Sequence, residues 1–451
     1  MRDSNPSLTQ RSLAAVWHPC TQMQQAMRYP PLAIDRGLGP WLYDPQGGRY
    51  FDAISSWWVN LLGHAQPQIN AAIKAQLDKL PHTMLAGCTH EPAVLLAEKL
   101  SVLTQQHLGH AFYASDGASA VEIALKMSFH YWRNTGQAQK QRFVCLQGSY
   151  HGETLGALSV TDVAIFRSTY DALIQKPLLV ASPACANMHE QAPRMAAALQ
   201  ALEQLLHAQH ASIAAVILEP LVQCAGGMLM YLPAYLAAAR QLCNRYAVHL
   251  IADEIAVGCG RTGQFFAWQH SLPEGGTTAT VADASHWPDF ITLSKGITGG
   301  TLPLSLVLCQ DPIYEAFLSD DAARGFLHSH SYTGNPLACA AAVAVIDLLQ
   351  GGVLASVAQQ SRDLQQGLQA ALGQDERLEN IRQIGLIWAC DIKPQYAGEH
   401  FSERLHQAGR RHELLIRPIG RSIYLMPPML LTPSHAAWLA QALKAALDEV
   451  A

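Results

Sequence analysis

From about residue 110 onward, short apolar runs alternate with stretches of helical periodicity. The runs AFYA, RFVCLQ, AAVILEP, VHLIADE and DFITLSK are separated by helical patterns such as ASAVEIALKMSFHYW and PAYLAAARQLCNRY. Two runs, AAVILE and HLIAD, are continuously apolar, as expected of strands that helices cover on both faces. The alternation predicts an α/β fold built on a mostly parallel sheet.

The C-terminal part of the chain follows a different pattern. The long helical stretches NPLACAAAVAVIDLLQ and SVAQQSRDLQQGLQAAL are followed by the short extended segments LIWACDI and SIYLMPP, which predicts a second, α+β domain. A chain of 451 residues, 49% of them hydrophobic, can bury the core of one large or two moderate domains. Residues 273–286 are polar and aperiodic, which favours a surface loop.

Composition and charge exclude several classes of partner. The formal net charge of −5 leaves no basic excess for a phosphate backbone, so we expect no nucleic acid partner. Residues 220–239 lack charge, but glycines and a proline interrupt them, so we expect no membrane span. The ten cysteines are scattered singly, which predicts buried, reduced thiols. With no apolar secretory segment at the start, the cytoplasm is the expected location.

The segment SDGASAVE follows the run AFYA and opens a helix. In open α/β sheets, ligands bind beyond the carboxyl ends of the strands, so such positions carry most of the information about function. Gly117 lets the backbone approach a ligand, and free N–H groups with the helix dipole favour a phosphate there. An ordinary helix start capped by Ser115 or Asp116 would give the same pattern.

Two charged residues end apolar runs. Asp253 follows HLIA, where a buried carboxylate needs a partner, either a protonated pyridine nitrogen or a neighbouring loop. Lys295 lies between DFITLS and the glycine-rich GITGG, with room around its amine. Burial and nearby positive charge would lower the lysine pKa and leave the neutral amine that Schiff-base chemistry requires. A solvated lysine at a strand end is the alternative.

Two patterns that could indicate other cofactors are rejected. Gly258-x-Gly260-x-x-Gly263 is formally a dinucleotide fingerprint, but no clear amphipathic helix begins at QFFAWQH, so we reject a nicotinamide cofactor. His328 and His330 could bind a metal, but neither HExxH nor a carboxylate at helical spacing accompanies them. We therefore expect no metal site.

Further segments could contribute to a pocket. Tyr150, in GSYHGET, could lie against a flat cofactor ring. Ser331, in HSHSYTGNP, could contact a phosphate or simply belong to the loop that caps the next helix. Arg417 would meet a carboxylate of the protein or of a substrate. In a strand, the adjacent Trp57 and Trp58 would face opposite ways, one to the core and one to a pocket.

Taken in order, the segments SDGASAVE, GSYHGET, ILEP, IADEIAVGCGRTG, LSKGITGG and HSYTGNP resemble those of the class III, fold-type I pyridoxal-phosphate aminotransferases over nearly the whole chain. The resemblance implies a large cofactor-binding domain at residues 66–325 with a mostly parallel, seven-stranded sheet. It also implies a small α+β domain at residues 326–451 and an N-terminal segment, residues 1–65, that contributes to the small domain and the active site. A cytoplasmic homodimer with shared active sites follows from the same resemblance.

The resemblance assigns roles to individual residues. Lys295 would bind pyridoxal 5′-phosphate (PLP) as a Schiff base and move the proton during transfer, while Asp253 would bind the ring nitrogen. Tyr150 would stack near the ring and touch the substrate. The phosphate contacts, of which the last two come from the other subunit, would be Gly117, Ala118, His330 and Ser331. Besides Tyr150 and Lys295, the expected substrate contacts are Trp57, Ser329 and Arg417, with Arg261, Tyr424 and Cys20 as further candidates.

WHPCTQ, SSWW and IRPIGRSIYLMPP resemble more narrowly the members that move the amino group of S-adenosylmethionine to 8-amino-7-oxononanoate in biotin synthesis. Two half-reactions in one site imply ping-pong kinetics. Relatives often carry tyrosine where this chain has Cys20, so the amino donor stays open between adenosylmethionine and lysine. The alternatives are a class III aminotransferase for ω-amino acids or diamines and a catalytically silent cofactor-binding protein on this fold.

Overall fold

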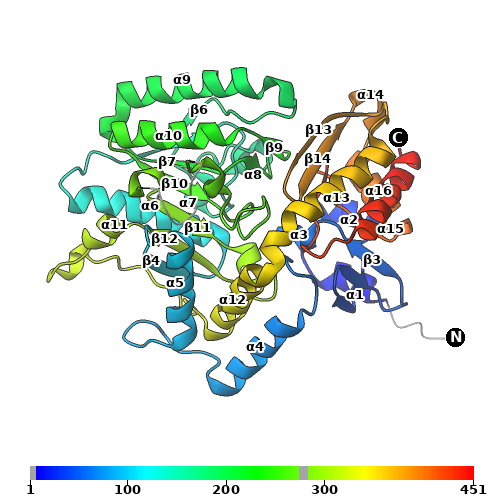
Figure 1. The fold of residues 1–451 in the computed structure, drawn as a ribbon, viewed down its shortest axis with the longest axis horizontal. Coiled ribbons are helices and arrows are strands. Elements are labelled where there is room, and N and C mark those ends of the chain that lie inside the picture. The colour runs from blue at the N-terminus through cyan, green and yellow to red at the C-terminus, as the bar shows by residue number, and fades with distance from the viewer. Residues whose placement is uncertain (1–6, 274–282) are drawn as a thin grey trace.

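Seven strands form the central sheet, in the order β4-β12-β11-β10-β7-β5-β6. The structure is a computed structural model that describes residues 7–273 and 283–451 (Figure 1). β12 is antiparallel to both of its neighbours, and the other pairs are parallel. The mostly parallel, seven-stranded sheet is thereby confirmed. In chain order the strands are β4 (His110–Ala114), β5 (Arg142–Leu146), β6 (Leu178–Val180), β7 (Ile213–Leu218), β10 (His249–Asp253), β11 (Phe290–Leu293) and β12 (Ser305–Cys309).

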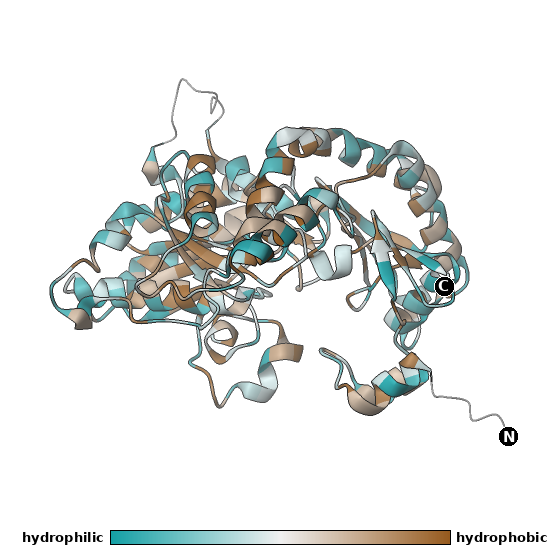
Figure 2. Cartoon of the chain, turned by 90° about the horizontal axis from the view of Figure 1, so that it is seen from below, coloured by the Kyte–Doolittle hydropathy of each residue, from teal (hydrophilic) through white to brown (hydrophobic). Residues whose placement is uncertain are grey.

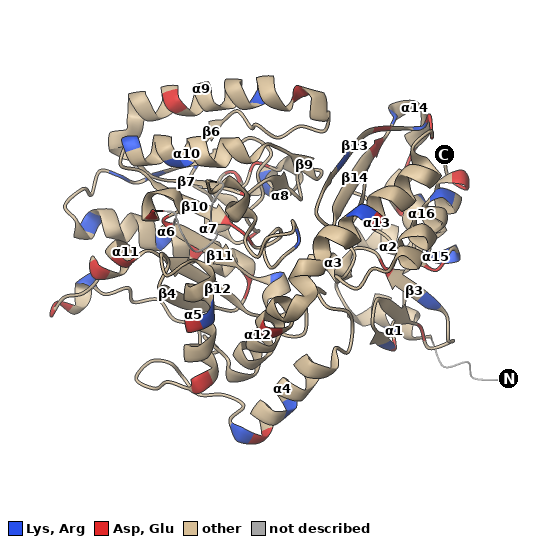
Figure 3. Ribbon diagram, viewed as in Figure 1, with Lys and Arg blue, Asp and Glu red and all other residues tan. Residues whose placement is uncertain are grey.

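The middle strands are apolar because helices cover both of their faces. Every residue of β7, β10, β11 and β12 is buried. Figure 2 shows hydrophobic strands between helices whose outer turns are more hydrophilic. In Figure 3, basic and acidic residues are scattered over these helices rather than gathered into a patch of one sign. The helices of this large part are α4 (Pro67–Lys79), α5 (Glu91–Leu103), α6 (Gly117–Asn134), α7 (Leu155–Leu158), α8 (Ala164–Arg167), α9 (Gln191–Gln209), α10 (Pro233–Arg245) and α11 (Asp311–Glu315).

The residues that were tested as a membrane span, 220–239, form a small hairpin and a helix. The hairpin pairs β8 (Val222–Gln223) with β9 (Leu229–Met230), and α10 follows. One other segment, Pro336–Leu372, is long and apolar enough by composition to cross a membrane. It consists of α12 (Pro336–Leu348), a π-helical turn (Leu349–Val353) and α13 (Leu354–Leu372). Since α12 packs against α4 and α5, packing in the core accounts for its composition.

Two small sheets form the rest of the molecule. One has the order β1 (Arg36–Leu38), β2 (Trp41–Tyr43), β3 (Arg49–Asp52) and β15 (Leu414–Leu415), and the other the order β13 (Leu378–Ile384), β14 (Ile387–Ile392) and β16 (Ser422–Leu425). The parallel pairing of β3 with β15 joins the N-terminal segment to the C-terminal part. The division of the chain after residues 65 and 325 stays a prediction. The accompanying helices are α1 (Leu8–Ala15), α2 (Met23–Arg28), α14 (Pro394–Ala397), α15 (Phe401–Arg411) and α16 (Pro433–Asp448).

Some local expectations were wrong. Residues 55–58 form the short, kinked helix α3 (Ser55–Trp58) with positive φ angles at all four positions, not a strand. Trp58 is nevertheless buried while Trp57 is 38% exposed, so the turn separates the two rings. All ten cysteines are free, but Cys20 and Cys88 are exposed rather than buried. Most of the predicted loop at residues 273–286 lies outside the described residues.

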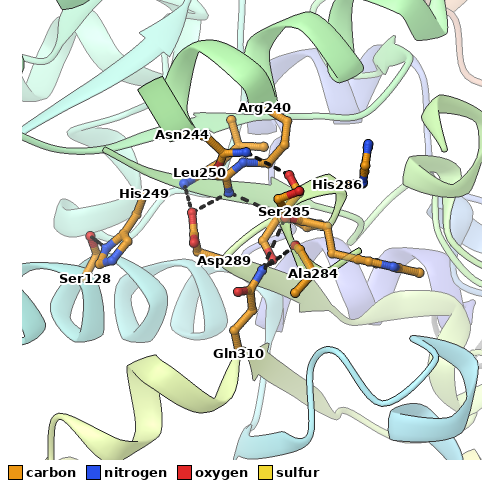
Figure 4. A network of polar contacts seen from close by, with 12 residues as sticks. Ser128, Arg240, Asn244, His249, Leu250, Ala284, Ser285, His286, Asp289 and Gln310 are labelled. Carbon is orange, nitrogen blue, oxygen red and sulfur yellow. Dashed lines mark hydrogen bonds and ion pairs between the residues drawn. The ribbon is translucent and has the colours of Figure 1, made fainter. Parts of the chain in front are cut away.

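A polar network holds the amino-terminal edge of the sheet (Figure 4). Asp289 Oδ2 accepts from Arg240 Nη1 at 2.5 Å and from the Leu250 N–H of β10 at 2.6 Å. Gln310 Nε2 donates to the carbonyls of residues 284, 287 and 288. Nearby, His249 Nδ1 lies 2.9 Å from Ser128 Oγ. These contacts join α10, β10 and the segment before β11.

Candidate active site

Four neighbouring strands place polar residues at the carboxyl edge of the sheet, opposite the amino-terminal edge that the Asp289 network holds. Tyr150 and His151 follow β5, Glu219 follows β7, Asp253 ends β10, and Lys295 follows β11. Because these strands are parallel, their carboxyl ends meet at one edge, and the side chains converge there.

Asp253 is a buried carboxylate with three donors. It is 4% exposed, and its Oδ2 accepts from His151 Nδ1 at 2.7 Å. Its Oδ1 accepts from Thr292 Oγ1 at 3.2 Å and from the Ile255 N–H at 3.1 Å. His151 Nε2, on the far side of the ring, is buried without a partner in the described residues. The carboxylate is therefore held rigidly and can still accept a hydrogen bond from a cationic ring nitrogen.

Lys295 begins the 3₁₀ turn η6 (Lys295–Thr298) with a positive φ of 48°. Its Nζ lies 5.5 Å from the centroid of the Trp58 ring. No protein group hydrogen-bonds that Nζ among residues 7–273 and 283–451. Burial lowers the pKa of Lys295, whereas Asp253, Cys224 and Glu219 raise it. The expectation that positive charge would help was wrong: the titratable groups that act on this amine are acids, and burial alone favours its neutral form.

Glu219 is a second buried acid at this edge. Its Oε1 accepts from the Tyr150 N–H at 3.1 Å and its Oε2 from the Cys224 N–H at 3.0 Å. Burial, followed by the charge of Asp253, raises its pKa to about 8. Glu219 is thus largely protonated at neutral pH. The sequence reading assigned no role to Glu219 or His151, although both stand at strand ends, the position that identified Lys295.

The N-terminus of α6 combines a capped start with two free donors. Asp116 is the N-cap, and its Oδ1 accepts from the Ser119 N–H at 2.9 Å. The N–H groups of Gly117 and Ala118 have no protein acceptor within the described chain, as the first turn of a helix dictates. The two alternatives for this segment are compatible, because the Asp116 cap leaves these donors free for an anion.

Tyr150 lies at the rim of the site. Its hydroxyl donates to Glu153 Oε1 at 2.9 Å, and its ring centroid lies 5.2 Å from that of Phe166. Burial, reinforced by Glu153, raises the pKa of the phenol. Tyr150 thus stays neutral, and its ring is held on two sides.

Arg417 is held without a carboxylate. Its guanidinium lies 4.5 Å from the centroid of the Trp57 ring and donates to the Cys20 carbonyl at 3.1 Å. No salt bridge to Arg417 occurs in the part of the chain that the structure describes. The alternative that Arg417 pairs with a protein carboxylate is therefore not found among the described residues. Its guanidinium is available to a substrate carboxylate.

Two other candidate substrate contacts, Tyr424 and Arg261, hydrogen-bond to Trp58. Trp58 Nε1 donates to the Tyr424 hydroxyl at 3.1 Å. Arg261 is 1% exposed and donates to three backbone carbonyls, those of Pro427, Trp58 and Asn60. Arg261 thereby anchors the backbone of the tryptophan pair.

Ser329, His330 and Ser331 lie in the loop before α12. No hydrogen bond joins them to Lys295, Asp253 or Tyr150 within residues 7–273 and 283–451. Asn335, in the same segment HSHSYTGNP, caps α12, so the loop does cap the next helix. The structure therefore brings Lys295, Asp253, Tyr150 and the α6 N-terminus to one edge, and no hydrogen bond in the described part of the chain links this loop to them.

An unbonded, buried lysine beside a rigid aspartate, with a free helix N-terminus at the same edge, defines an enzyme of the PLP-dependent class on an α/β fold. The residues present fit that cofactor: an amine for its aldehyde, a carboxylate for its ring nitrogen and N–H groups for its phosphate.

Comparisons with known proteins give the family. The model of the family described as aminotransferase class-III matches residues 22–447, so the chain belongs to the class III aminotransferases and is a PLP-dependent aminotransferase. The adenosylmethionine-8-amino-7-oxononanoate aminotransferase of Helicobacter pylori is 40% identical over 450 residues, 98% of each chain. The protein of that name from Anoxybacillus flavithermus is 38% identical over 450 residues, 98% of this chain and 96% of the relative.

Solved structures agree. The adenosylmethionine-8-amino-7-oxononanoate aminotransferase of Methanocaldococcus jannaschii matches with a TM-score of 0.89 and 32% identity, covering 98% of this chain and 99% of the other. An amine transaminase from an uncultivated Pseudomonas species, in its PLP-bound form, matches with a TM-score of 0.87 and 31% identity, covering 97% and 99%.

Proposed function

We propose that this chain transfers the amino group of S-adenosylmethionine to 8-amino-7-oxononanoate, forming 7,8-diaminononanoate in biotin synthesis by a ping-pong mechanism. The names of relatives in three organisms support this substrate pair. One observation of the structure carries it. Arg417, which has no acidic partner among the described residues, lies against the Trp57 ring, and Lys295 Nζ lies against the ring of the adjacent Trp58. The two tryptophans of one turn thus contact both the reactive lysine and the arginine that would bind a substrate carboxylate.

The site residues divide the work of handling the cofactor. Gly117 and Ala118 would bind the phosphate of PLP through their N–H groups. Asp253, oriented by His151 and Thr292, would keep a proton on the ring nitrogen, and Tyr150 would lie against the ring. When bound, PLP supplies the electron sink for amino transfer.

Lys295 would act twice. It would hold the cofactor by a covalent bond to Nζ and, once released by an amino donor, carry the proton between donor and cofactor carbons. The neutral form that burial favours is the form able to do both. Trp58, against Nζ, limits water at that atom.

Substrate recognition would centre on Arg417. Its guanidinium would bind the carboxylate of 8-amino-7-oxononanoate over Trp57. The other expected substrate contacts are Tyr150, Tyr424, Ser329, Cys20 and, through its hold on the Trp58 backbone, Arg261.

The active unit would be a cytoplasmic homodimer in which His330 and Ser331 of the partner subunit complete the phosphate site. Large apolar side chains near this loop are exposed in the single chain, as a subunit contact requires: Leu327 is 83% exposed and Tyr332 is 67% exposed. The ten free thiols suit a reducing compartment.

Half-reactions test the substrate pair. The pyridoxamine form, mixed with 8-amino-7-oxononanoate, should return to the PLP spectrum within one turnover time, and adenosylmethionine should convert the PLP form in the other direction. Lysine in place of adenosylmethionine distinguishes the two donors. Failure with 8-amino-7-oxononanoate together with rapid reaction of a simple 2-oxo acid would establish the second candidate, an amine or ω-amino acid aminotransferase, which the Pseudomonas neighbour favours.

A further inference from the structure

Three polar side chains form a hydrogen-bonded chain between α6 and the loop before α12. Lys126 Nζ lies 2.8 Å from His328 Nδ1, and His328 Nε2 lies 3.3 Å from His330 Nε2. The His328 ring stacks on Phe326 with ring centroids 5.7 Å apart and meets the edge of Phe112. Lys126 follows Glu122 by one helical turn. The group is separate from the Lys295 edge.

The donor and acceptor groups fix the direction of the hydrogen bonds from Lys126 through His328 to His330. A lysine ammonium has only donors, so Nδ1 of His328 must accept and its ring proton must sit on Nε2. That proton is donated to His330 Nε2, which therefore accepts. His330 Nδ1 is then the ring nitrogen that remains to donate to a group outside these three side chains. Burial, followed by the charges of Lys126 and His330, lowers the pKa of His328, which agrees with a neutral ring.

The backbone around His330 is also fixed. The His330 N–H donates to Thr333 Oγ1 at 3.1 Å, and the Thr333 N–H returns a bond to the His330 carbonyl at 3.0 Å. His90 Nε2 contacts the Gly334 carbonyl at 2.8 Å. Lys126 lies nine residues beyond Gly117, about 13 Å along the helix at 1.5 Å per residue. These hydrogen bonds thus connect His330 to α6 at Lys126, beyond the turn that carries Gly117.

We propose that Lys126 and His328 are positioning residues that orient His330 as an N–H donor to the cofactor phosphate in the partner subunit's site. The proposal rests on the proposed function in one respect: it assumes that His330 contacts the cofactor phosphate of the partner subunit. It adds two residues that touch neither cofactor nor substrate and act through the tautomer of His330.

The test compares PLP with pyridoxal, which lacks the phosphate, in binding to the full-length dimer by absorbance titration. Lys126→Met keeps the aliphatic stem, and His328→Phe keeps the stacking on Phe326 while removing both ring nitrogens. Each variant should bind PLP about five- to tenfold more weakly, the size of one ordinary hydrogen bond, because the His330 contact is misoriented rather than removed, and should bind pyridoxal as the wild type does. Lys126→Arg, which restores a cationic donor, should recover PLP affinity to within about twofold.

Lys444→Met on α16 is the matched control, since among the described residues Lys444 pairs with Asp448 on its own helix. It should leave both affinities unchanged. Wild-type PLP affinity in Lys126→Met and His328→Phe would overturn the proposal, as would an equal loss for PLP and pyridoxal, which marks a general structural defect. A monomer that binds PLP at full affinity would overturn it too. Because no amino substrate enters the titration, these results are independent of the proposed substrate pair.

Discussion

Both edges of the central sheet carry a lysine, an aspartate and a histidine, yet only one edge has the free donors and acceptors that chemistry needs. At the amino edge, Lys140 Nζ donates to three carbonyls, those of residues 210, 213 and 247, and Asp289 pairs with Arg240. At the carboxyl edge, Lys295 Nζ has no protein acceptor among the described residues, and Asp253 faces His151 rather than an arginine. The same residue types form a structural site where the protein satisfies their hydrogen bonds, and a reactive site where some of their donors or acceptors are left unused.

Strand β10 carries both arrangements. Its first residues, His249 and Leu250, contact Ser128 and Asp289, and its last residue is Asp253. Each edge contains buried polar groups, Lys140 and His249 at one and Asp253 and His151 at the other, so burial alone does not mark the active site. The unused hydrogen-bonding capacity of the buried groups does.

The largest contrast should come from the two lysines. Lys295→Ala should lower the turnover rate by about 10³-fold or more and abolish the covalent link to PLP, because no other amine in the described site can replace its Nζ. Lys140→Met should keep turnover per folded molecule while lowering the free energy of unfolding, since three carbonyls lose their donor. Steady-state rates, absorbance spectra and urea unfolding of both variants check this. Full activity of Lys295→Ala would contradict the account.

The two aspartates should separate in the same way. Asp253→Asn should reduce the turnover rate about 100-fold or more, because a neutral amide cannot hold a proton on the ring nitrogen. It should leave the midpoint of urea unfolding near that of the wild type, since the amide can still accept from His151. Comparable rates for Asp253→Asn and the wild type would remove the ring-nitrogen role.

Asp289→Asn should show the reverse. It leaves the buried Arg240 guanidinium without its counter-charge, which costs about 3 kcal/mol in the free energy of unfolding. Turnover per folded molecule should stay at the wild-type level. A stable Asp289→Asn variant with a slow turnover would show that this edge, too, acts on the chemistry.

The pH dependence of stability should differ in sign between the edges. Glu219, with its pKa raised from 4.5 to about 8, binds a proton in the folded state that the unfolded state releases. Its contribution is therefore present at low pH and is lost as the pH rises, by about 2 kcal/mol between pH 6 and pH 8. Glu219→Gln should flatten that decline in urea-unfolding series. If the free energy of unfolding falls with pH as steeply in Glu219→Gln as in the wild type, Glu219 does not bind that proton.

His249 should give an effect of similar size, on the acid side. Burial lowers its pKa from 6.5 to about 4, so the unfolded state binds the extra proton between these values. Stability should fall as the pH drops from 6 to 4, by about 2 kcal/mol from this residue. His249→Asn should weaken that fall in unfolding curves measured at several pH values, whatever its effect at pH 7. A slope equal to that of the wild type would contradict a neutral buried ring.

The sequence sufficed where a residue type and its place at a strand end carried the information. The seven-stranded sheet and its strand-end Lys295 and Asp253 follow from apolar runs and the residues that stop them. The turn at residues 55–58 was missed, because its positive φ angles belong to residues that rarely adopt them. The partners of buried groups were missed as well. That Asp253 faces His151 while Asp289 faces Arg240 depends on contacts over more than forty residues of chain, which no local pattern encodes.

The central claim, that the partnerless lysine is the reactive one, is tested most directly by reducing the holoenzyme with borohydride and mapping the labelled peptide by mass spectrometry. The account predicts one phosphopyridoxyl group per chain, on Lys295. A label on another lysine such as Lys140, or a holoenzyme that releases all of its PLP after reduction, would contradict it.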